Sequence, residues 1–137
     1  MRTVLVVESD FHVRALIAAV LTRANYRVAV SEDLGGIIEE AALASPDAIL
    51  LDADAGGPQF GFDLLVQLRR NTATEDTAIV LMTGMTDADT LARLEGDSGT
   101  LCLEKPFSRR ELLQAVASAC GPRVSPGNAP PVHLYSV

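Results

Sequence analysis

Tryptophan is absent from the 137-residue sequence, and aromatic side chains make up only 4% of it. Basic residues are also few. Eleven stand against eighteen acidic ones, and the formal charge of −7 argues against a surface that follows nucleic-acid phosphates or anionic lipid. No apolar run approaches the roughly 20 residues that span a bilayer, so we expect neither a nucleic acid nor a membrane as a partner. Hydrophobic residues still make up 48%, enough for a compact core, which excludes general disorder.

Cysteine and lysine are scarce as well. Cys102 and Cys120 form no CxxC motif, so two reduced thiols in a cytoplasmic protein are expected. Lys105 is the one lysine among eleven basic residues. In a chain that otherwise uses arginine, a single lysine indicates a position that needs a compact ammonium rather than a fork-shaped guanidinium.

Short apolar runs alternate with segments of helical periodicity along most of the chain. Runs that are apolar on both faces and separated by helices are typical of a parallel sheet with helices on both sides. Right-handed crossovers then predict an α/β, doubly wound fold, in which ligands bind at the carboxyl ends of the strands. The strands expected from these runs are 4–7, 26–30, 48–52, 78–82 and 101–103.

Polar and ionisable side chains stand where four of these strands end. Carboxylates gathered at one edge of a sheet attract a hard divalent cation, usually Mg²⁺, which lets a phosphoryl group approach an anionic oxygen. A hydroxyl and an ammonium on adjacent strands would hold the other oxygens of the transferred group. The pattern therefore predicts a phosphoryl-transfer site, although each acid taken singly is as well explained as a solvated turn residue. The residues concerned are Glu8, Ser9, Asp10, Asp52, Thr83, Glu104 and Lys105.

Four motifs carry a family resemblance through their order and spacing. They are Val6-Val7-Glu8-Ser9-Asp10, Pro46-Asp47 to Leu51-Asp52, Met82-Thr83-Gly84 and Lys105-Pro106-Phe107. Together they resemble the receiver domain of two-component response regulators, the CheY-like family, whose flavodoxin-like fold is one of the doubly wound orders. The predicted fold is therefore a five-stranded parallel sheet of order 2-1-3-4-5 with five helices, in a domain that covers residues 1–120.

The resemblance implies a role for each residue of the site. Asp52 would accept a phosphoryl group from a histidine kinase or a phosphotransfer protein. Thr83 and Lys105 would contact the phosphoryl oxygens. Glu8, Asp52 and the backbone carbonyl of Asp54 would hold Mg²⁺. The chain would then be a signalling module and not an enzyme, apart from phosphorylation and dephosphorylation of its own Asp52.

The same resemblance implies how the module works in the cell. Its output would be an altered contact with a downstream protein that the sequence does not name, and it would be a monomer or a weak homodimer. It would act in the cytoplasm. The family also implies a cis peptide bond before Pro106.

Three positions depart from the family pattern. The acidic pair after the first strand is Glu8-Ser9, so a neutral hydroxyl replaces one carboxylate ligand, and weak Mg²⁺ binding with slow phosphorylation is expected. Asp10 is expected to cap the first helix, whereas Asp54 is expected to turn inward because its loop has one extra residue. Cys102 stands where an aromatic switch is usual, so a conformational change is expected to use Thr83 and residues 84–87, with the helix 108–120 as docking surface.

Two other functions stay open. The first is a degenerate receiver that binds a partner without phosphorylation, which Ser9 and Cys102 favour. The second is a haloacid-dehalogenase-like phosphatase, suggested by the Asp52-Ala53-Asp54 spacing, although no acidic pair follows Lys105. A receiver should respond to acetyl phosphate or beryllofluoride with Mg²⁺, a degenerate receiver should not, and a phosphatase should turn the phosphate over continuously.

Two further segments receive simple interpretations. Residues 121–137 contain four prolines and two glycines and are expected to be a tail or linker stub whose apolar end packs against its own domain or a neighbouring chain. The doublet Arg69-Arg70 is expected to be solvated at a helix end.

Overall fold

The computed structural model describes all 137 residues except 32–33, 58–59, 85–87, 95, 122–133 and 137. No helix in the described ranges is both long and apolar enough to cross a membrane. The strands are Thr3–Val7 (β1), Arg27–Ser31 (β2), Ala48–Asp52 (β3), Ala78–Thr83 (β4), Thr100–Glu104 (β5) and Leu134–Ser136 (β6). The helices are Phe11–Arg23 (α1), Ile37–Ala44 (α2), Phe60–Arg70 (α3), Ala88–Arg93 (α4) and Arg109–Ala119 (α5), with a 3₁₀ turn at Leu34–Gly36.

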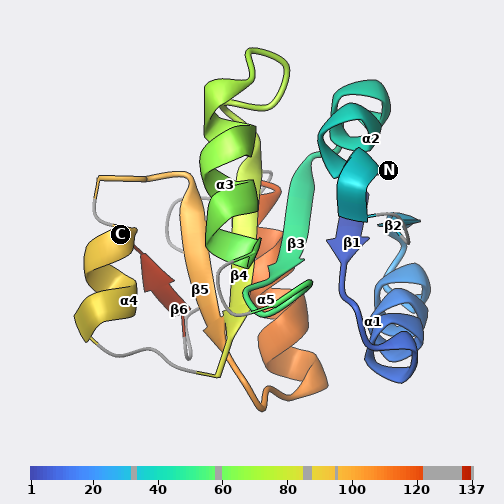
Figure 1. The fold of residues 1–137 in the computed structure, drawn as a ribbon. Helices are drawn as coiled ribbons and strands as arrows, with labels where there is room; N and C mark the ends of the chain where they lie inside the picture. The colour runs from blue at the N-terminus through green and yellow to red at the C-terminus, as the bar shows by residue number, and fades with distance from the viewer. Residues whose placement is uncertain (32–33, 58–59, 85–87, 95, 122–133, 137) are drawn as a thin grey trace.

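The strands form one sheet of order β2-β1-β3-β4-β5-β6 (Figure 1). The first five are parallel, which confirms the predicted order 2-1-3-4-5. The sixth strand, β6, pairs antiparallel with β5 and was not predicted as a strand. Three residues after a stretch rich in proline carry too little alternation to indicate one. The described part of the C-terminal segment, Leu134–Ser136, thus pairs with a strand of its own domain, one of the two expected outcomes.

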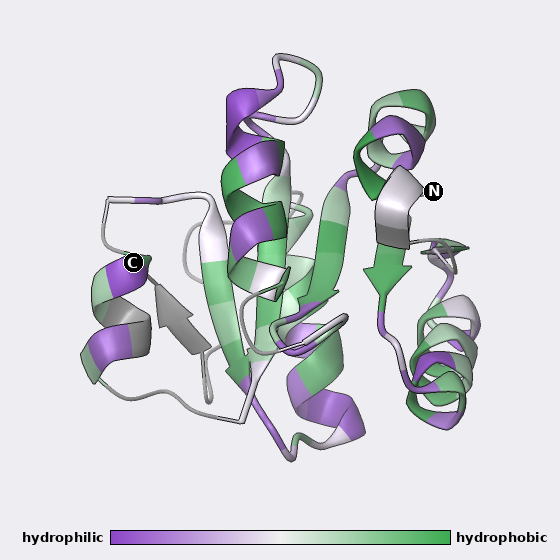
Figure 2. Cartoon of the chain, viewed as in Figure 1, coloured by the Kyte–Doolittle hydropathy of each residue, from purple (hydrophilic) through white to green (hydrophobic). Residues whose placement is uncertain are grey.

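Side chains of each central strand alternate between two cores, because successive residues in a strand point to opposite faces. Leu5, Ile49 and Leu81 join the core beneath α2 and α3. Val6 and Leu50 join the core beneath α1 and α5. Figure 2 shows the central strands as almost entirely apolar, as expected for a sheet buried on both faces.

Two helices begin next to the predicted site with side-chain caps. Asp10 caps α1 and accepts hydrogen bonds from the backbone N–H groups of His12 and Val13 at 2.8 and 3.1 Å. Ser108 caps α5 in a reciprocal capping box with Glu111. Such caps satisfy N–H groups that the first helical turn leaves without intrahelical partners. They also fix the chain just after β1 and β5, where the site residues lie.

The segment after β3 is held close to α3 by one glycine. A Cβ atom on Gly61 would lie 2.4 Å from the backbone oxygen and 2.5 Å from the Cα of Ala53. The N–H of Gly61 donates to that same oxygen at 3.2 Å. Only a residue without a side chain allows this approach, which positions the backbone directly after Asp52.

Candidate functional site

Asp52 lies at the centre of a buried group of ionisable side chains at the carboxyl ends of the strands. It is the last residue of β3, and only 3% of its surface is exposed. Lys105, just beyond β5, donates a hydrogen bond from Nζ to Asp52 Oδ1 at 2.9 Å. Glu8, just beyond β1, is buried to the same degree as Asp52, and its Oε1 lies 3.8 Å from Lys105 Nζ. The structure thus brings together three residues that the sequence singled out from three strand ends.

Backbone hydrogen bonds fix the group. The N–H of Lys105 donates to the carbonyl of Thr83 at 2.8 Å, which ties the segment after β5 to the end of β4. The N–H of Asp54 donates to Asp52 Oδ1 at 3.0 Å. Thr83 itself is 5% exposed and ends β4, next to β3 and Asp52. The peptide bond between Lys105 and Pro106 is cis, as the family resemblance implied.

The two carboxylates have opposite pKa shifts. Burial raises the pKa of Glu8, and the neighbouring Asp52 carboxylate raises it further. Burial would also raise the pKa of Asp52, but hydrogen bonds from Lys105 and from the Asp54 N–H outweigh burial and hold the pKa of Asp52 below its ordinary value. Asp52 is therefore the more acidic of the two carboxylates.

The surroundings of Glu8 test whether a cation fits. Glu8 Oε2 accepts a hydrogen bond from the Asp10 N–H at 3.1 Å. Its other oxygen, Oε1, is buried and accepts no hydrogen bond from the described residues. A buried carboxylate oxygen without a hydrogen bond, beside a second carboxylate, suits a hard cation with oxygen ligands. Glu8 and Asp52 therefore fit a divalent metal ion, with two carboxylates available to it.

Three other polar side chains that the sequence placed beside this site are exposed. Ser9 and Asp10 are exposed, and the Asp10 carboxylate is engaged by the start of α1, as predicted. Asp54 is exposed too, and its carbonyl accepts the Gly57 N–H at 3.1 Å. Among the described residues, no three Asp, Glu, His or Cys side chains gather closely enough to hold a metal. The expected inward turn of Asp54 is therefore not seen.

Cys102 fills a position in the core instead of bearing a mobile ring. It is fully buried in the cluster that contains Leu51 and Leu81. Burial raises the pKa of its thiol to about 11, so the thiol stays protonated and unreactive near neutral pH. The sequence predicts that a conformational change uses Thr83 and residues 84–87 instead. Residues 85–87 of this segment lie outside the described residues.

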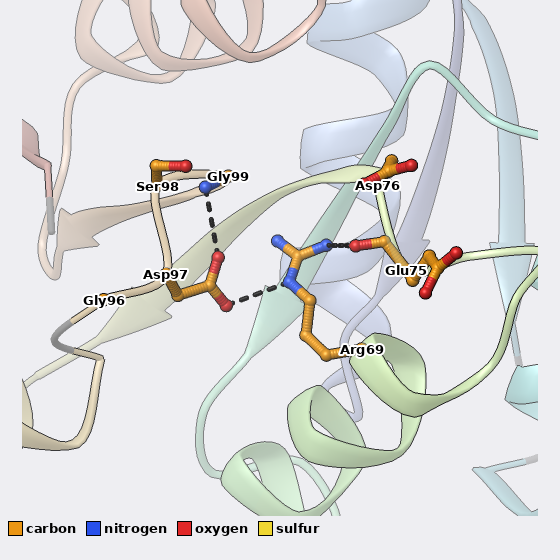
Figure 3. A pocket seen from close by; sticks show the side chains of 7 residues that line it. All are labelled: Arg69, Glu75, Asp76, Gly96, Asp97, Ser98 and Gly99. Atoms are coloured by element: carbon orange, nitrogen blue, oxygen red, sulfur yellow. Dashed lines mark hydrogen bonds and ion pairs between the residues drawn. The ribbon is translucent and has the colours of Figure 1, made fainter.

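Arg69 has a role that the sequence interpretation missed. It was expected to be solvated like Arg70, but it is half-buried and ties together the amino ends of β4 and β5. Its guanidinium donates to Asp97 Oδ2 at 2.9 Å, to the carbonyls of Glu75 and Thr77, and to Thr100 Oγ1 at 3.0 Å. Figure 3 shows Arg69 pointing toward Asp97 across a pocket of about 560 Å³.

The Arg69 pocket lies at the amino ends of the strands, whereas Glu8, Asp52 and Lys105 lie at their carboxyl ends. Each guanidinium nitrogen already donates to a protein group. The arrangement is therefore a structural clamp. In the sequence, only the polar turn at residues 96–99 could have indicated a partner for Arg69. Because the two segments are far apart in the sequence, this contact can be predicted only once the fold is known.

Comparison with known proteins agrees with this geometry. The model of the response regulator receiver domain matches residues 4–117, and the chain belongs to this family. Over 124 residues it is 31% identical to the phosphate regulon transcriptional regulatory protein PhoB of Pseudomonas aeruginosa, with 88% of this chain and 54% of that protein covered. The chain thus spans about half the length of this regulator.

Solved structures share the fold. A putative response regulator from Chloroflexus aurantiacus matches with a TM-score of 0.75 and 26% identity, over 87% of this chain and 97% of that one. A second match is the receiver domain of the sensor histidine kinase PA1611 from Pseudomonas aeruginosa, which was solved with a magnesium ion in its active-site cleft. It matches with a TM-score of 0.75 and 24% identity, over 88% of this chain and 98% of that one. The fold predicted from the sequence is confirmed.

Proposed function

We propose that this chain is a phosphoacceptor receiver domain in a two-component phosphorelay and that Asp52 is the residue that is phosphorylated. The observation that carries the proposal is the 2.9 Å hydrogen bond from Lys105 Nζ to Asp52 Oδ1. It leaves Asp52 ionised although buried, at the sheet edge where doubly wound folds bind ligands. The donor would be a histidine kinase or a phosphotransfer protein.

The chemistry is a phosphoryl transfer between two protein side chains. An oxygen of the Asp52 carboxylate attacks the phosphorus of a phosphohistidine, a P–O bond forms, and the P–N bond breaks with its electron pair going to the imidazole. Both Lys105 Nζ and the Asp54 N–H donate to Oδ1, so Oδ2 is the oxygen we assign to the attack. Release of the phosphoryl group from Asp52 to water would end the signal.

Lys105 and Thr83 would hold the product. Once Asp52 carries the phosphoryl group, the Lys105 ammonium is placed to contact a phosphoryl oxygen, and the Thr83 hydroxyl on the adjacent strand to contact another. Glu8, Asp52 and the Asp54 carbonyl would hold Mg²⁺, which when bound neutralises charge on the phosphoryl oxygens. With only two carboxylates at hand, we expect Mg²⁺ to bind weakly.

The direct test is phosphorylation by acetyl phosphate in Mg²⁺, followed by intact-protein mass spectrometry. Wild-type protein should gain one phosphoryl group, and Asp52→Asn should gain none. Asp54→Asn is the matched control, because it removes an exposed carboxylate two residues away and should leave the mass gain intact. Phosphorylation of Asp52→Asn to the wild-type extent would refute the assignment.

A degenerate receiver that binds its partner without phosphorylation is the second candidate. The exposed Ser9 favours it, since the metal site there lacks one carboxylate. The same experiment decides: no mass gain, and no spectral response to beryllofluoride with Mg²⁺, would favour this function. The haloacid-dehalogenase-like alternative would require Asp54 as acid and base near Asp52, and its exposure outside the acidic group argues against that role.

We further propose the organisation around this site. Residues 1–120 would form the receiver unit, and residues from 121 would lead out of it. The protein would act in the cytoplasm as a monomer or a weak homodimer. Its output would be an altered contact with a downstream protein, with α5 as part of the docking surface.

A further inference from the structure

The turn between β1 and α1 carries Glu8, and one long side chain of α1 reaches back to it. Arg14 lies one turn into α1, where its backbone N–H donates to the carbonyl of Asp10 at 2.9 Å. Long side chains in a helix point back toward its N-terminus, so Arg14 is directed at the turn before the helix. Its Nη1 donates to the backbone carbonyl of Glu8 at 3.0 Å. The guanidinium therefore ties the backbone of Glu8 to α1.

The ring of Phe11 gives this guanidinium a second contact. The central carbon of the Arg14 guanidinium lies 5.6 Å from the centroid of the Phe11 ring, which is within the range of a cation–π interaction. Arg14 is half-buried, whereas Phe11 is exposed. A planar guanidinium can rest against an aromatic ring and donate a hydrogen bond at the same time. The two contacts together restrict where the Arg14 side chain can lie.

Glu8 is thus fixed at two of its atoms. Arg14 holds the backbone carbonyl, and the Asp10 N–H donates to the carboxylate oxygen Oε2 at 3.1 Å. The other carboxylate oxygen, Oε1, accepts no hydrogen bond from the described residues. It lies 3.8 Å from Nζ of Lys105, the same ammonium that donates to Asp52. One defined oxygen of Glu8 is therefore available to a ligand within the acidic group.

We propose that Arg14 is a positioning residue for the cation site, because it holds the Glu8 backbone where Oε1 is presented to Mg²⁺. The inference rests on the metal site of the proposed function and adds a residue that touches neither the metal nor the phosphoryl group. Ser9 supplies no carboxylate, so Glu8 and Asp52 are the acidic side chains available to the metal. With only two such ligands, the placement of one of them has a large effect on affinity.

The charge of Arg14 makes the direction of its effect informative. A cation near a metal site repels the metal, so the loss of this positive charge alone should tighten Mg²⁺ binding. The loss of a contact that holds a metal ligand in place should instead weaken binding, commonly by about 10- to 100-fold. A purely electrostatic role and a positioning role therefore predict opposite changes in Mg²⁺ affinity.

Arg14→Met tests the proposal, because it keeps an apolar stem and removes every hydrogen-bond donor of the side chain. NMR titration of the backbone amides of residues 8–10 with Mg²⁺ should show binding about tenfold weaker than in the wild type. Arg14→Lys should give an intermediate affinity, since an ammonium can still donate to the Glu8 carbonyl. Arg23→Met is the matched control. It removes the same charge from the exposed last turn of α1 and should bind Mg²⁺ at least as tightly as the wild type.

The rate of phosphorylation by acetyl phosphate separates positioning from direct contact with the phosphoryl group. In Arg14→Met, the Mg²⁺ concentration that gives half the maximal rate should rise about tenfold. The rate at saturating Mg²⁺ should stay within about twofold of the wild type, because the metal-loaded site is the same in both proteins. A much lower rate at saturating Mg²⁺ would mean that Arg14 acts on the phosphoryl group itself, and the positioning role would be wrong.

The remaining outcomes are also decisive. Equal or tighter Mg²⁺ binding in Arg14→Met would overturn the proposal, and so would a wild type whose amides do not respond to Mg²⁺. If circular dichroism shows that Arg14→Met has lost its native secondary structure, Arg14→Lys decides: weaker binding than in the wild type supports the proposal, and equal binding overturns it. If Mg²⁺ binds as expected but Asp52 gains no phosphoryl group, the phosphoacceptor function fails while the role of Arg14 stands.

Discussion

Lys105 reaches across the end of β4 to Asp52, a residue 53 positions earlier in the chain, and donates a 2.9 Å hydrogen bond to its carboxylate. The one lysine of the sequence is thus the cation that keeps a buried aspartate ionised. An ammonium on a flexible stem can make this bond and also turn toward a new phosphoryl oxygen, which a rigid guanidinium does less readily.

Lys105→Met should raise the pKa of Asp52. Burial raises the pKa of Asp52, and in this variant the hydrogen bond from Lys105 would no longer oppose that effect. Because the wild-type pKa of Asp52 is lowered in the folded state, Asp52 contributes stability above its unfolded pKa of about 3.9, and this contribution disappears as pH falls through the folded pKa. NMR titration of the Asp52 carboxyl carbon measures the change. Lys105→Arg is the control and should keep the pKa low, and an unchanged titration in Lys105→Met would contradict the assigned pairing.

Glu8→Gln should stabilise the metal-free protein at pH 8. The pKa of Glu8 is raised in the folded state, so ionisation of Glu8 at high pH destabilises the folded protein. The uncharged glutamine side chain does not ionise and avoids this loss of stability. The gain should shrink as pH falls toward the ordinary pKa of glutamate, about 4.3. Urea denaturation in EDTA at several pH values measures it. Glu75→Gln, at an exposed glutamate, should give no such pH-dependent gain.

Gly61→Ala should destabilise the protein by about 1–3 kcal/mol, because the new Cβ would lie 2.4 Å from a backbone oxygen that cannot easily move. It should also slow phosphorylation, since the displaced backbone of Ala53 adjoins Asp52. Gly84→Ala makes the same chemical change where no atom lies within 4 Å of the new Cβ. Equal free energies of unfolding in the two variants would count against the close approach at Gly61.

Ser9→Asp should tighten Mg²⁺ binding on the order of tenfold, about 1.4 kcal/mol, and speed phosphorylation by acetyl phosphate. A carboxylate beside Glu8 would add the third acidic ligand that the described residues do not supply. Titration calorimetry on the two proteins measures the affinity, with Ser9→Asn as the neutral control. Identical affinities in wild type and Ser9→Asp would place Ser9 outside the metal site.

Ser108→Ala should lower the free energy of unfolding by about 1 kcal/mol, because it removes the cap of α5 and breaks the reciprocal bond with Glu111. Ser118→Ala, the same substitution at an exposed position inside this helix, should be neutral or slightly stabilising. Urea denaturation distinguishes them. A loss of similar size in both variants would mean that the effect is not capping.

The fold was predictable because its signals are local and repeated. Apolar runs such as Ile49–Leu51 can be buried on both faces only in a covered parallel sheet, and polar residues at strand ends must then share one rim. The convergence of Glu8, Asp52 and Lys105 followed from this topology. The cap at Asp10 was also visible, since aspartate directly before a helical stripe is a strong start signal.

The sequence interpretation was less successful where a contact depends on the packing of distant segments. Asp54 was expected to turn toward the site, but its N–H bonds to Asp52 while the residue stays exposed. Arg69 was expected to be solvated, and residues 134–136 were expected to pack against their own domain or a neighbouring chain but were not predicted as a strand. Each of these contacts depends on which backbone groups still lack a hydrogen-bond partner after the sheet has formed. The periodicity of the sequence does not indicate which groups those are.

The clamp at Arg69 makes the two ends of β4 and β5 mechanically unequal. At the amino ends, a single guanidinium locks a helix, a turn and a strand together through four hydrogen bonds. At the carboxyl ends, Thr83 and Lys105 are joined by one backbone hydrogen bond beside the acidic group. Among the described residues, Arg69 therefore ties the amino ends of these strands with more hydrogen bonds than Thr83 and Lys105 share at the carboxyl ends. If Asp52 is phosphorylated as proposed, we expect the resulting displacement at the carboxyl ends of β4 and β5, where a partner protein would detect it.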